Sequence, residues 1–421
     1  MRRKSFSCIA SYLQMALLSL LLITAYGCAA APKAEVSNTE KEAAQPDVSS
    51  TGLRGALIGG LSGGPGGAAP AKVFKEVLEK KDHYRTVWYG TNRQPDDQWD
   101  GANRQHNSKG PGYTDGRDQK VHYGKLTVFV PESHKLGSFK SPHWYYRVLG
   151  KDRMKVEWEE LARFSEDDFV KDIRKELDRM QGDEKIIFVY IHGYNVDFEK
   201  AAVRTAQLSE DLSINGIAAF YSWPSKGQLT GYLADEATVE ASERYLYEFL
   251  SFIADKRKEI GASNVHIIAH SMGNRALLRA LNRLEAEKKE PQFGKIFLAA
   301  PDVDSDVFES LAKVYPKIAS GTTLYLSPKD VAMKEEAKFV HKSSRVGYPP
   351  PVTIMRGIET VSFEGKTDLL HFGGHLYYAD SIVVLCHLYE KIHGVRPTSD
   401  ECKSMSKTRK VTPRGEYIVI K

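Results

Sequence analysis

The stretch that decides the fold runs from Val265 to Arg275 and reads VHIIAHSMGNR. A short apolar run, typical of a buried strand, ends abruptly at Ser271, and a helical pattern of apolar residues begins at Ala276. Between the two lies a small-x-Ser-x-Gly sequence, with Ala269 in the first small position, which is the form of a nucleophile elbow. The strand before it and the long helix after it favour this interpretation over a chance serine in a turn.

Small residues flank Ser271 for a geometric reason. A strained strand-to-helix turn must hold the serine hydroxyl out at the top of a sheet, so a bulky side chain two residues away would collide with neighbouring elements. The same turn directs the backbone N–H of Met272, and the positive end of the following helix, to the place where an oxyanion would form. Ser271 is therefore the candidate nucleophile, and Met272 is a candidate oxyanion-hole residue.

The composition is that of a globular protein. The chain has 421 residues, of which 42% are hydrophobic and 27% are charged, and its formal net charge is +5. This length is ample for a large hydrophobic core. Because no dense basic stripe with interleaved aromatic residues occurs in the sequence, nucleic acid is not an expected partner.

The N-terminus has the three-part layout of a secretory signal, with Arg2, Arg3 and Lys4 before an apolar stretch and a small residue before Cys28. The last part resembles a bacterial lipobox, so we expect residues 1–27 to be a signal peptide and Cys28 to carry a lipid. The expected location is then the bacterial cell envelope, lipid-anchored to a membrane on the periplasmic or outer-membrane side. Secretion without a lipid, and a retained apolar anchor, are the alternatives.

A linker is expected between this signal and the folded part of the chain. Residues 28–71 are rich in Gly, Ala and Pro and contain few large apolar side chains, which predicts a disordered tether. Residues 72–421 remain as one folded domain, with a core from about residue 84 to residue 393.

Apolar strand patterns alternate with helical patterns through this domain. Strands are expected at 86–93, 123–131, 186–191, 216–223, 265–270, 295–300, 322–326, 352–354, 359–363 and 416–420, and helices at 164–180, 198–212, 234–260, 276–284, 305–319, 331–339 and 379–392. The segment 95–120 is polar and is expected to be a surface excursion. The alternation predicts an α/β fold with a mostly parallel sheet covered on both faces, and reactive groups at the carboxyl ends of its strands.

The catalytic base is expected downstream of the nucleophile, because α/β-hydrolase triads follow the order Ser, acid, His. His371 and His375 both lie in the loop between the last central strand and the last helix. His375 is favoured because two glycines precede it and a helix follows it directly. Packing or surface roles are expected for the other downstream histidines, His341, His387 and His393.

The acid has two possible positions. Asp330 follows the strand 322–326, whereas Asp302 and Asp304 follow the preceding strand. The usual position of the triad acid favours Asp330, with Asp302 and Asp304 as alternatives. Either carboxylate would fix the imidazole tautomer and stabilise the imidazolium, and the residue not used could cap the helix at 305–319.

The second oxyanion donor is expected in the loop after the strand 186–191. That loop reads His192-Gly193-Tyr194-Asn195, and the backbone N–H of Tyr194 is the natural donor. The imidazole of His192 is expected to have a structural role, because the loop needs its backbone and not a second base.

No metal or other cofactor is expected. Four residues, His192, His270, Asp302 and His375, could be imagined around an ion, but no H-E-x-x-H or cysteine pair of metal-binding type is present. The two downstream cysteines, Cys386 and Cys402, could form a disulfide in an oxidising compartment, or Cys386 could be a buried free thiol.

Several motifs together resemble a bacterial family of α/β hydrolases, of uncharacterised substrate, that is close to the esterases and lipases. They are YGTNR (89–93), HGYN (192–195), FYSWPSKG (220–227), AHSMGNR (269–275), APDVD (300–304) and GH (374–375). The resemblance implies the α/β-hydrolase fold, Ser271 as the nucleophile and His375 as the base. Leu376 departs from the small hydroxyl residue that is common after this histidine.

The predicted function is a serine hydrolase that cleaves carboxylic esters or lipids through an acyl-enzyme, with a small-molecule ester or lipid as its partner. Two alternatives remain open. The same triad could serve acyl transfer or amide cleavage, depending on how the loops 225–236 and 331–351 exclude water. Alternatively, the chain could be an inactive lipid-anchored binding protein of the envelope.

Overall fold

The structure is a computed structural model that describes residues 83–96, 112–138, 153–182, 185–287, 292–367 and 372–421. The chain divides into two units, Met1–Gly66 and Gly67–Lys421, and the described residues all belong to the second. The expected signal peptide, the tether and Cys28 lie outside the described residues, as does His371.

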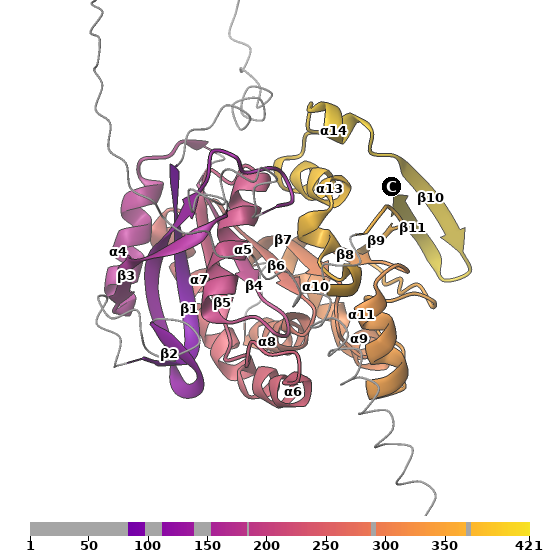
Figure 1. Cartoon of the computed structure of the whole chain (residues 1–421), viewed down its shortest axis with the longest axis horizontal. Coiled ribbons are helices and arrows are strands. Elements are labelled where there is room, and N and C mark those ends of the chain that lie inside the picture. Colours follow the sequence, from indigo (N-terminus) through magenta and orange to yellow (C-terminus); the bar gives the residue numbers. More distant parts are fainter. Residues whose placement is uncertain (1–82, 97–111, 139–152, 183–184, 288–291, 368–371) are drawn as a thin grey trace, which may run out of the picture. The chain divides into compact units, whose positions relative to one another are not determined.

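Eleven strands within the described residues form one sheet (Figure 1). Its order is β10-β11-β9-β8-β7-β6-β4-β5-β1-β2-β3. The eight central strands, β11-β9-β8-β7-β6-β4-β5-β1, are all parallel to their neighbours. The remaining strands, β2 and β3 at one edge and β10 at the other, pair antiparallel. The strands are β1 (His83–Pro95), β2 (Tyr113–Val130), β3 (Lys155–Phe164), β4 (Ile186–Ile191), β5 (Ile217–Ser222), β6 (Asn264–His270), β7 (Phe293–Ala299), β8 (Ala319–Leu326), β9 (Glu359–Phe363), β10 (Lys407–Thr412) and β11 (Gly415–Ile420).

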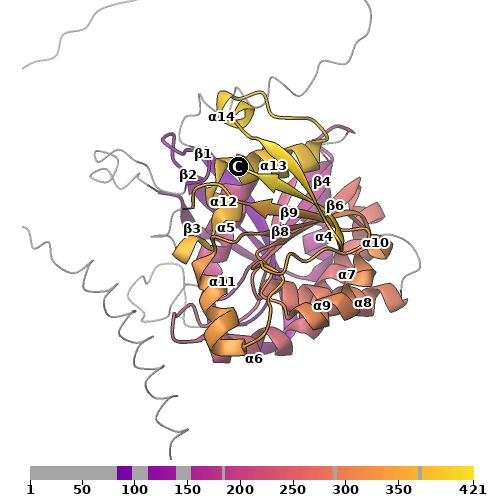
Figure 2. The same ribbon diagram turned by 90° about the vertical axis from the view of Figure 1, so that its right-hand side faces the viewer.

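Helices cover both faces of this sheet, so the predicted α/β fold with a mostly parallel central sheet is confirmed. In Figure 2, α7, α8 and α9 lie on one side of the strands, and α5 and α12 lie on the other. The helices are α4 (Glu166–Leu177), α5 (Phe198–Asp211), α6 (Tyr232–Ala241), α7 (Glu243–Ile260), α8 (Gly273–Glu287), α9 (Ser305–Leu311), α10 (Tyr315–Ile318), α11 (Val331–Glu335), α12 (Tyr377–Asp380), α13 (Ile382–His393) and α14 (Asp400–Lys403), with short non-α turns η4 (Ala312–Val314), η5 (Glu336–His341) and η6 (Phe372–Gly374).

Two hydrophobic cores follow from the alternation of side chains along the strands. All six residues of β4 are buried. Ile187, Val189 and Ile191 belong to the core beneath α4, α7 and α8, whereas Phe188 and Tyr190 belong to the core beneath α5 and α13. Because successive side chains of a strand point to opposite faces, a continuous apolar run is what a sheet covered on both sides requires.

Some expected elements differ from the observed ones. The surface excursion at 95–120 is wrong in its last part, because β2 already begins at Tyr113, whose ring packs 4.8 Å from that of Phe198. The helix expected at 234–260 is two helices that meet at Ser242, whose hydroxyl accepts a hydrogen bond from Asn92. The helix expected at 305–319 is interrupted by η4, and 352–354 forms no strand.

The C-terminal end of the domain carries a disulfide. Cys386 on α13 and Cys402 on α14 are bonded, with their Cα atoms 5.5 Å apart. The bond therefore ties α13 to the segment that leads into the β10–β11 hairpin. Among the described helices, none combines the length and the apolar character needed to span a membrane.

Candidate active site

The turn between β6 and α8 has the geometry of a nucleophile elbow. Ser271 adopts a left-handed backbone conformation with φ of +51°, which non-glycine residues take up only where the surroundings enforce it. Its N–H donates to Ala299 O at 3.0 Å. The side-chain amide of Asn274 donates to Ala269 O at 2.9 Å and to Ser271 O at 3.2 Å. These bonds hold the strained turn from both sides.

Two glycines allow the chain after β4 to lie directly against the elbow. A Cβ on Gly193 would sit 2.7 Å from the Cβ of Ser271, and one on Gly273 would sit 2.5 Å from the carbonyl oxygen of His192. Neither approach is possible for a residue with a side chain. The Gly193 loop and the Ser271 turn are therefore packed backbone to backbone, as the small residues of the sequence motif predict.

His375 and Asp330 form a buried hydrogen-bonded pair. His375 Nδ1 lies 2.7 Å from Asp330 Oδ2, and the two side chains are 2% and 0% exposed. The other oxygen of Asp330 accepts the N–H of Met333 at 3.0 Å, so the carboxylate also caps α11. Gly373 and Gly374, with φ of +63° and +79°, turn the chain into His375. The structure thus brings together the expected base and the favoured acid.

His270, the residue before Ser271, lies in contact with His375. The ring of His270 lies 4.6 Å from the ring of His375, and its Nε2 lies 3.4 Å from His375 O. Burial, and then the neighbouring His375, lower the pKa of His270 well below its ordinary value, so this ring is neutral at neutral pH. No hydrogen bond joins the Ser271 hydroxyl to His375 within the described part of the chain.

The alternative acids have other partners. Asp304 caps α9 by accepting the N–H groups of Asp306 and Val307 at 3.0 and 3.3 Å, which is the capping role expected for the carboxylate not used. Asp302 is fully buried and receives the guanidinium of Arg275 at 2.8 Å. No hydrogen bond to His375 is present for either carboxylate among the described residues.

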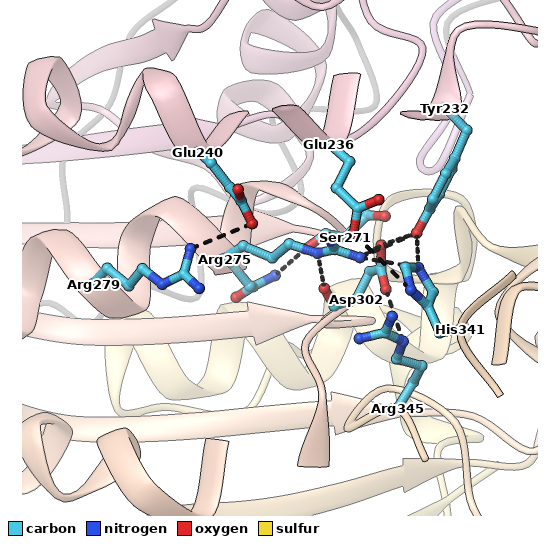
Figure 3. Close-up of polar contacts among 10 residues, drawn as sticks. Tyr232, Glu236, Glu240, Ser271, Arg275, Arg279, Asp302, His341 and Arg345 are labelled. Carbon is cyan, nitrogen blue, oxygen red and sulfur yellow. Dashed lines mark hydrogen bonds and ion pairs between the residues drawn. The ribbon is translucent and has the colours of Figure 1, made fainter. Parts of the chain in front are cut away.

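Asp302 is the centre of a polar cluster beside Ser271 (Figure 3). Arg275 donates to both the carboxylate and the carbonyl oxygen of Asp302, at 2.8 and 2.7 Å. The hydroxyl of Tyr232 donates to Asp302 Oδ2 at 2.7 Å and also contacts His341 Nε2. Arg345 Nε lies 3.4 Å from Asp302 Oδ1. Because the N–H of Asp302 bonds to Ser271 O at 3.3 Å, the cluster is connected directly to the elbow.

Burial and the neighbouring charges shift the pKa values of two carboxyl groups in this cluster, Asp302 and Glu336. Burial alone would raise the pKa of Asp302, but the guanidinium groups of Arg275 and Arg345 outweigh it and lower that pKa below its ordinary value. Glu336 is the reverse case, because burial, and then the carboxylates of Asp302 and Asp330, raise its pKa well above its ordinary value. Asp302 is therefore held ionised by two arginines, and the neighbouring Glu336 favours its protonated form.

The two expected oxyanion donors lie on the packed segments. Met272 follows Ser271 at the start of α8, and Tyr194 follows Gly193 in the loop after β4. The backbone N–H of neither residue donates to another described residue. His192 has the expected structural role: its ring stacks on Trp223 at 4.9 Å and bonds Ser222 Oγ at 3.1 Å. Burial, and then the charge of Arg93, lower the pKa of His192 to about 3.

A row of aromatic rings lies next to the buried pair. The ring of Phe372 lies 6.0 Å from that of His375, and the ring of Tyr194 lies 6.1 Å from Phe372 and 5.3 Å from Tyr232. Leu229 and Leu233, in and beside the N-terminus of α6, are 57% and 59% exposed. Both leucines lie on the segment that carries Tyr232.

Sequence reasoning did not assign the polar cluster. Asn274 and Arg275 stood in the deciding stretch but were given no role, although two polar residues directly after the elbow glycine were a usable signal. The other members of the cluster, Tyr232, Arg345 and Glu336, carry no motif in the sequence. They come from segments far apart in the sequence, so no local pattern identifies them. No group of three or more metal-ligating side chains occurs within the described ranges.

The folded part of the chain matches a known family. A sequence profile described as "Alpha/beta hydrolase of unknown function (DUF900)" matches residues 165–389, the part that holds the elbow and the His375–Asp330 pair. A curated relative, the uncharacterised protein alr1448 of Nostoc sp., is 28% identical over 132 residues, which cover 25% of this chain and 34% of that protein. The matched part of the chain thus spans about a third of the length of this relative.

Solved hydrolase structures also match at low identity. A predicted CIB-like hydrolase from Thermoplasma acidophilum is 17% identical, with a TM-score of 0.28 over 51% of this chain and 90% of that one. A dienelactone hydrolase from Anabaena variabilis is 12% identical, with a TM-score of 0.30 over 49% and 83%. An esterase from Rhizomucor miehei is 9% identical, with a TM-score of 0.33 over 78% and 93%.

Proposed function

The chain belongs to the alpha/beta hydrolase family of unknown function (DUF900), and we propose that it is a serine hydrolase that cleaves carboxylic esters or lipids through an acyl-enzyme. The observation that carries this proposal is the buried 2.7 Å contact between His375 Nδ1 and Asp330 Oδ2, next to a serine in a left-handed elbow. Nucleophile, acid and base follow one another along the chain in the order that α/β-hydrolase triads use.

In the proposed reaction, Ser271 Oγ attacks the acyl carbon and His375 Nε2 takes its proton. The hydrogen bond from Nδ1 to Asp330 leaves Nε2 free as the acceptor and stabilises the imidazolium. The backbone N–H groups of Met272 and Tyr194 stabilise the oxyanion, and His375 then returns the proton to the leaving alkoxide. Water, activated by the same imidazole, hydrolyses the acyl-enzyme. The hydrogen bond between serine and base forms in the substrate complex, since such bonds are often long in free enzymes.

An ester or lipid substrate is supported by the apolar side chains near the proposed triad. Tyr194, Tyr232 and Phe372 form the aromatic row, and Leu229 and Leu233 present apolar surface beside it. These side chains suit an acyl chain or another apolar group, because burial of apolar surface contributes about 25 cal/mol per Å². The proposed preference is therefore for acyl esters with an apolar part.

Hydrolysis of a series of p-nitrophenyl esters with short and long acyl chains tests the proposal. We expect turnover by the wild-type chain and a loss of at least 10³-fold in kcat/KM for Ser271→Ala. The matched control is Ser320→Ala, which removes a hydroxyl that donates to Gly294 O on the neighbouring strand, and it should keep turnover within about twofold. Reaction with a fluorophosphonate but no ester turnover would favour acyl transfer or amide cleavage. No reaction with either would favour the inactive binding protein.

We further propose that the chain is exported and anchored through a lipid on Cys28. The support is the lipobox-like sequence alone, because Cys28 lies outside the described residues. Incorporation of radiolabelled palmitate tests this location. Wild-type protein should be labelled and Cys28→Ala should not, and equal labelling of the two would refute the anchor.

A further inference from the structure

A cationic pocket opens in the segment that follows the proposed acid. It has a volume of about 490 Å³ and is lined entirely by residues between 334 and 350, on α11, η5 and the loop after them. Its lining includes Lys334, Lys338, Lys342 and Arg345, and none of the nine described residues that line it is acidic. A concave site with one sign of charge concentrates ions of the opposite sign.

One of the lining residues is a buried arginine, Arg345. Arg345 is 5% exposed, and its guanidinium donates no hydrogen bond to another described residue, although Nε lies 3.4 Å from Asp302 Oδ1. The Nε group is directed to Asp302, whereas the two Nη groups make no hydrogen bond to a described residue and are not fully enclosed. Because Arg345 lines the pocket, these Nη groups are the donors that it can offer to a ligand there.

The backbone around Arg345 is held rigidly. The N–H of Val346 donates to Val303 O at 3.0 Å, and the N–H of Gly347 donates to Pro301 O at 2.9 Å. A Cβ on Gly347 would lie 2.7 Å from the carbonyl carbon of Ala300, so the two backbones are in direct contact. The arginine thus lies on a preformed wall, and little ordering would be needed on binding.

The lysines supply the charge that Arg345 alone does not. Arg345 is partly balanced by Asp302, but Lys334 and Lys342 form no ion pair within the described part of the chain. Tyr348 adds a hydroxyl donor to the lining. A phosphate group carries a charge of about −1.5 to −2 and three strong acceptor oxygens, which matches several cations around one guanidinium.

We propose that this pocket binds a phosphate group, borne by a lipid headgroup or by a small phosphate ester. Its volume falls within the range of small-molecule sites, so it holds more than the phosphate itself. The bound group would contact Arg345, whose partner Asp302 bonds to Ser271 O at 3.3 Å. The site is thus one residue from the elbow, but its occupation can be measured without turnover and does not rest on the proposed function.

The test is calorimetric titration of the full chain with inorganic phosphate and with glycerol 3-phosphate at constant ionic strength. The pocket variant is Lys334→Gln/Lys338→Gln/Lys342→Gln. The matched control is Lys171→Gln/Lys258→Gln/Lys313→Gln, which removes the same charge from exposed positions on α4, α7 and η4. Thermal unfolding confirms that both variants fold. We expect saturable binding that weakens at least tenfold in the pocket variant and within twofold in the control.

Vesicles distinguish the source of the phosphate. All three proteins carry the same N-terminus, so differences in binding to vesicles with and without 20% phosphatidylglycerol report on the lysines alone. Pocket-dependent binding to these vesicles supports the lipid headgroup, and pocket-dependent binding to the soluble phosphates alone supports the small ester. Equal weakening in the pocket variant and the control, or no saturable binding of either probe, would overturn the proposal.

Discussion

Three aspartates follow neighbouring strands near Ser271, and their contacts assign each a different role. Asp330 bonds the ring of His375, Asp302 pairs with two arginines, and Asp304 caps α9. Only the first of these contacts can orient the proposed base. The sequence favoured Asp330 because it follows the strand after which the triad acid usually lies, and the hydrogen bond to His375 is the geometry that the proposed triad requires.

Asp330→Asn should reduce kcat/KM for ester hydrolysis by about 10³–10⁴-fold, because an amide at this position favours the wrong imidazole tautomer. The measurement is steady-state turnover of a p-nitrophenyl ester. The control is Asp304→Ala, which should destabilise the fold by about 1 kcal/mol through loss of the cap and keep turnover within about twofold. Comparable losses of turnover in both variants would show that Asp330 acts only through stability.

The second residue-scale prediction concerns Gly193. A Cβ here would lie 2.7 Å from Ser271 Cβ and 2.9 Å from His270 Nδ1, so Gly193→Ala must displace the loop that carries Tyr194. We expect a loss of at least tenfold in kcat. Gly321→Ala on β8 is the control, since its Cβ would meet only the flexible end of the Lys295 side chain. Unchanged kcat in Gly193→Ala would argue against an oxyanion hole in this loop.

At the scale of elements, the strands that the sequence predicted best are those buried on both faces. β4 and β5 are buried along their whole length and β6 is buried after its first residue, and a largely apolar run of that kind has few other possible environments. The edge strands β3 and β10 were missed because their side chains are largely exposed and charged. Their positions depend on pairing with β2 and β11, which no local pattern records.

Only those parts of the candidate site that carry a local sequence motif were predictable. The elbow, the loop of Tyr194 and the two-glycine approach to His375 each carry a short sequence signature. The cluster around Asp302 carries none, because Tyr232 on α6 and Arg345 beyond η5 meet only in the folded chain. Long-range polar contacts of this kind have no periodicity by which to find them.

The Arg275–Asp302 contact joins α8 to the loop after β7, and its loss should be costly. Arg275→Ala leaves a fully buried carboxylate with one arginine fewer, so we expect a loss of about 3 kcal/mol in the free energy of unfolding. The measurement is urea unfolding at pH 7. Arg279, one turn further along α8, pairs with Glu240 at 3.6 Å on the surface (Figure 3).

Arg279→Ala is the matched control and should change the free energy of unfolding by less than about 1 kcal/mol, because exposed ion pairs contribute little. If both variants lost the same stability, the buried contact would carry no more weight than a surface one. The difference between the two variants therefore measures how much burial adds to the stability that the Arg275–Asp302 contact provides.

On the scale of the whole molecule, buried neutral histidines should make the fold sensitive to acid. Burial, and then a nearby Arg or Lys, lower the pKa of His192 to about 3, of His266 to about 4 and of His387 to about 3. The unfolded chain binds these protons at about pH 6.5 and the folded chain does not. Their contribution to stability is therefore present above pH 6.5 and lost as the pH falls toward these lowered values.

Urea unfolding between pH 7.5 and pH 4 should show this loss, at up to about 1.4 kcal/mol per pH unit for each histidine. His387→Asn removes one titrating ring and should make the slope shallower. Tyr325→Phe removes the hydroxyl that bonds His387 Nδ1 at 2.8 Å, and it should lower stability at every pH while keeping the slope. An unchanged slope in His387→Asn would refute this assignment.

The most direct measurement of the central claim is fluorophosphonate labelling of the full chain, followed by peptide mapping of the adduct. We predict a single adduct on Ser271, none in Ser271→Ala, and strongly slowed labelling in His375→Gln, because the serine reacts only when the base accepts its proton. A folded wild-type chain that remains unlabelled, or that is labelled at another residue, would contradict the account of Ser271 as the nucleophile.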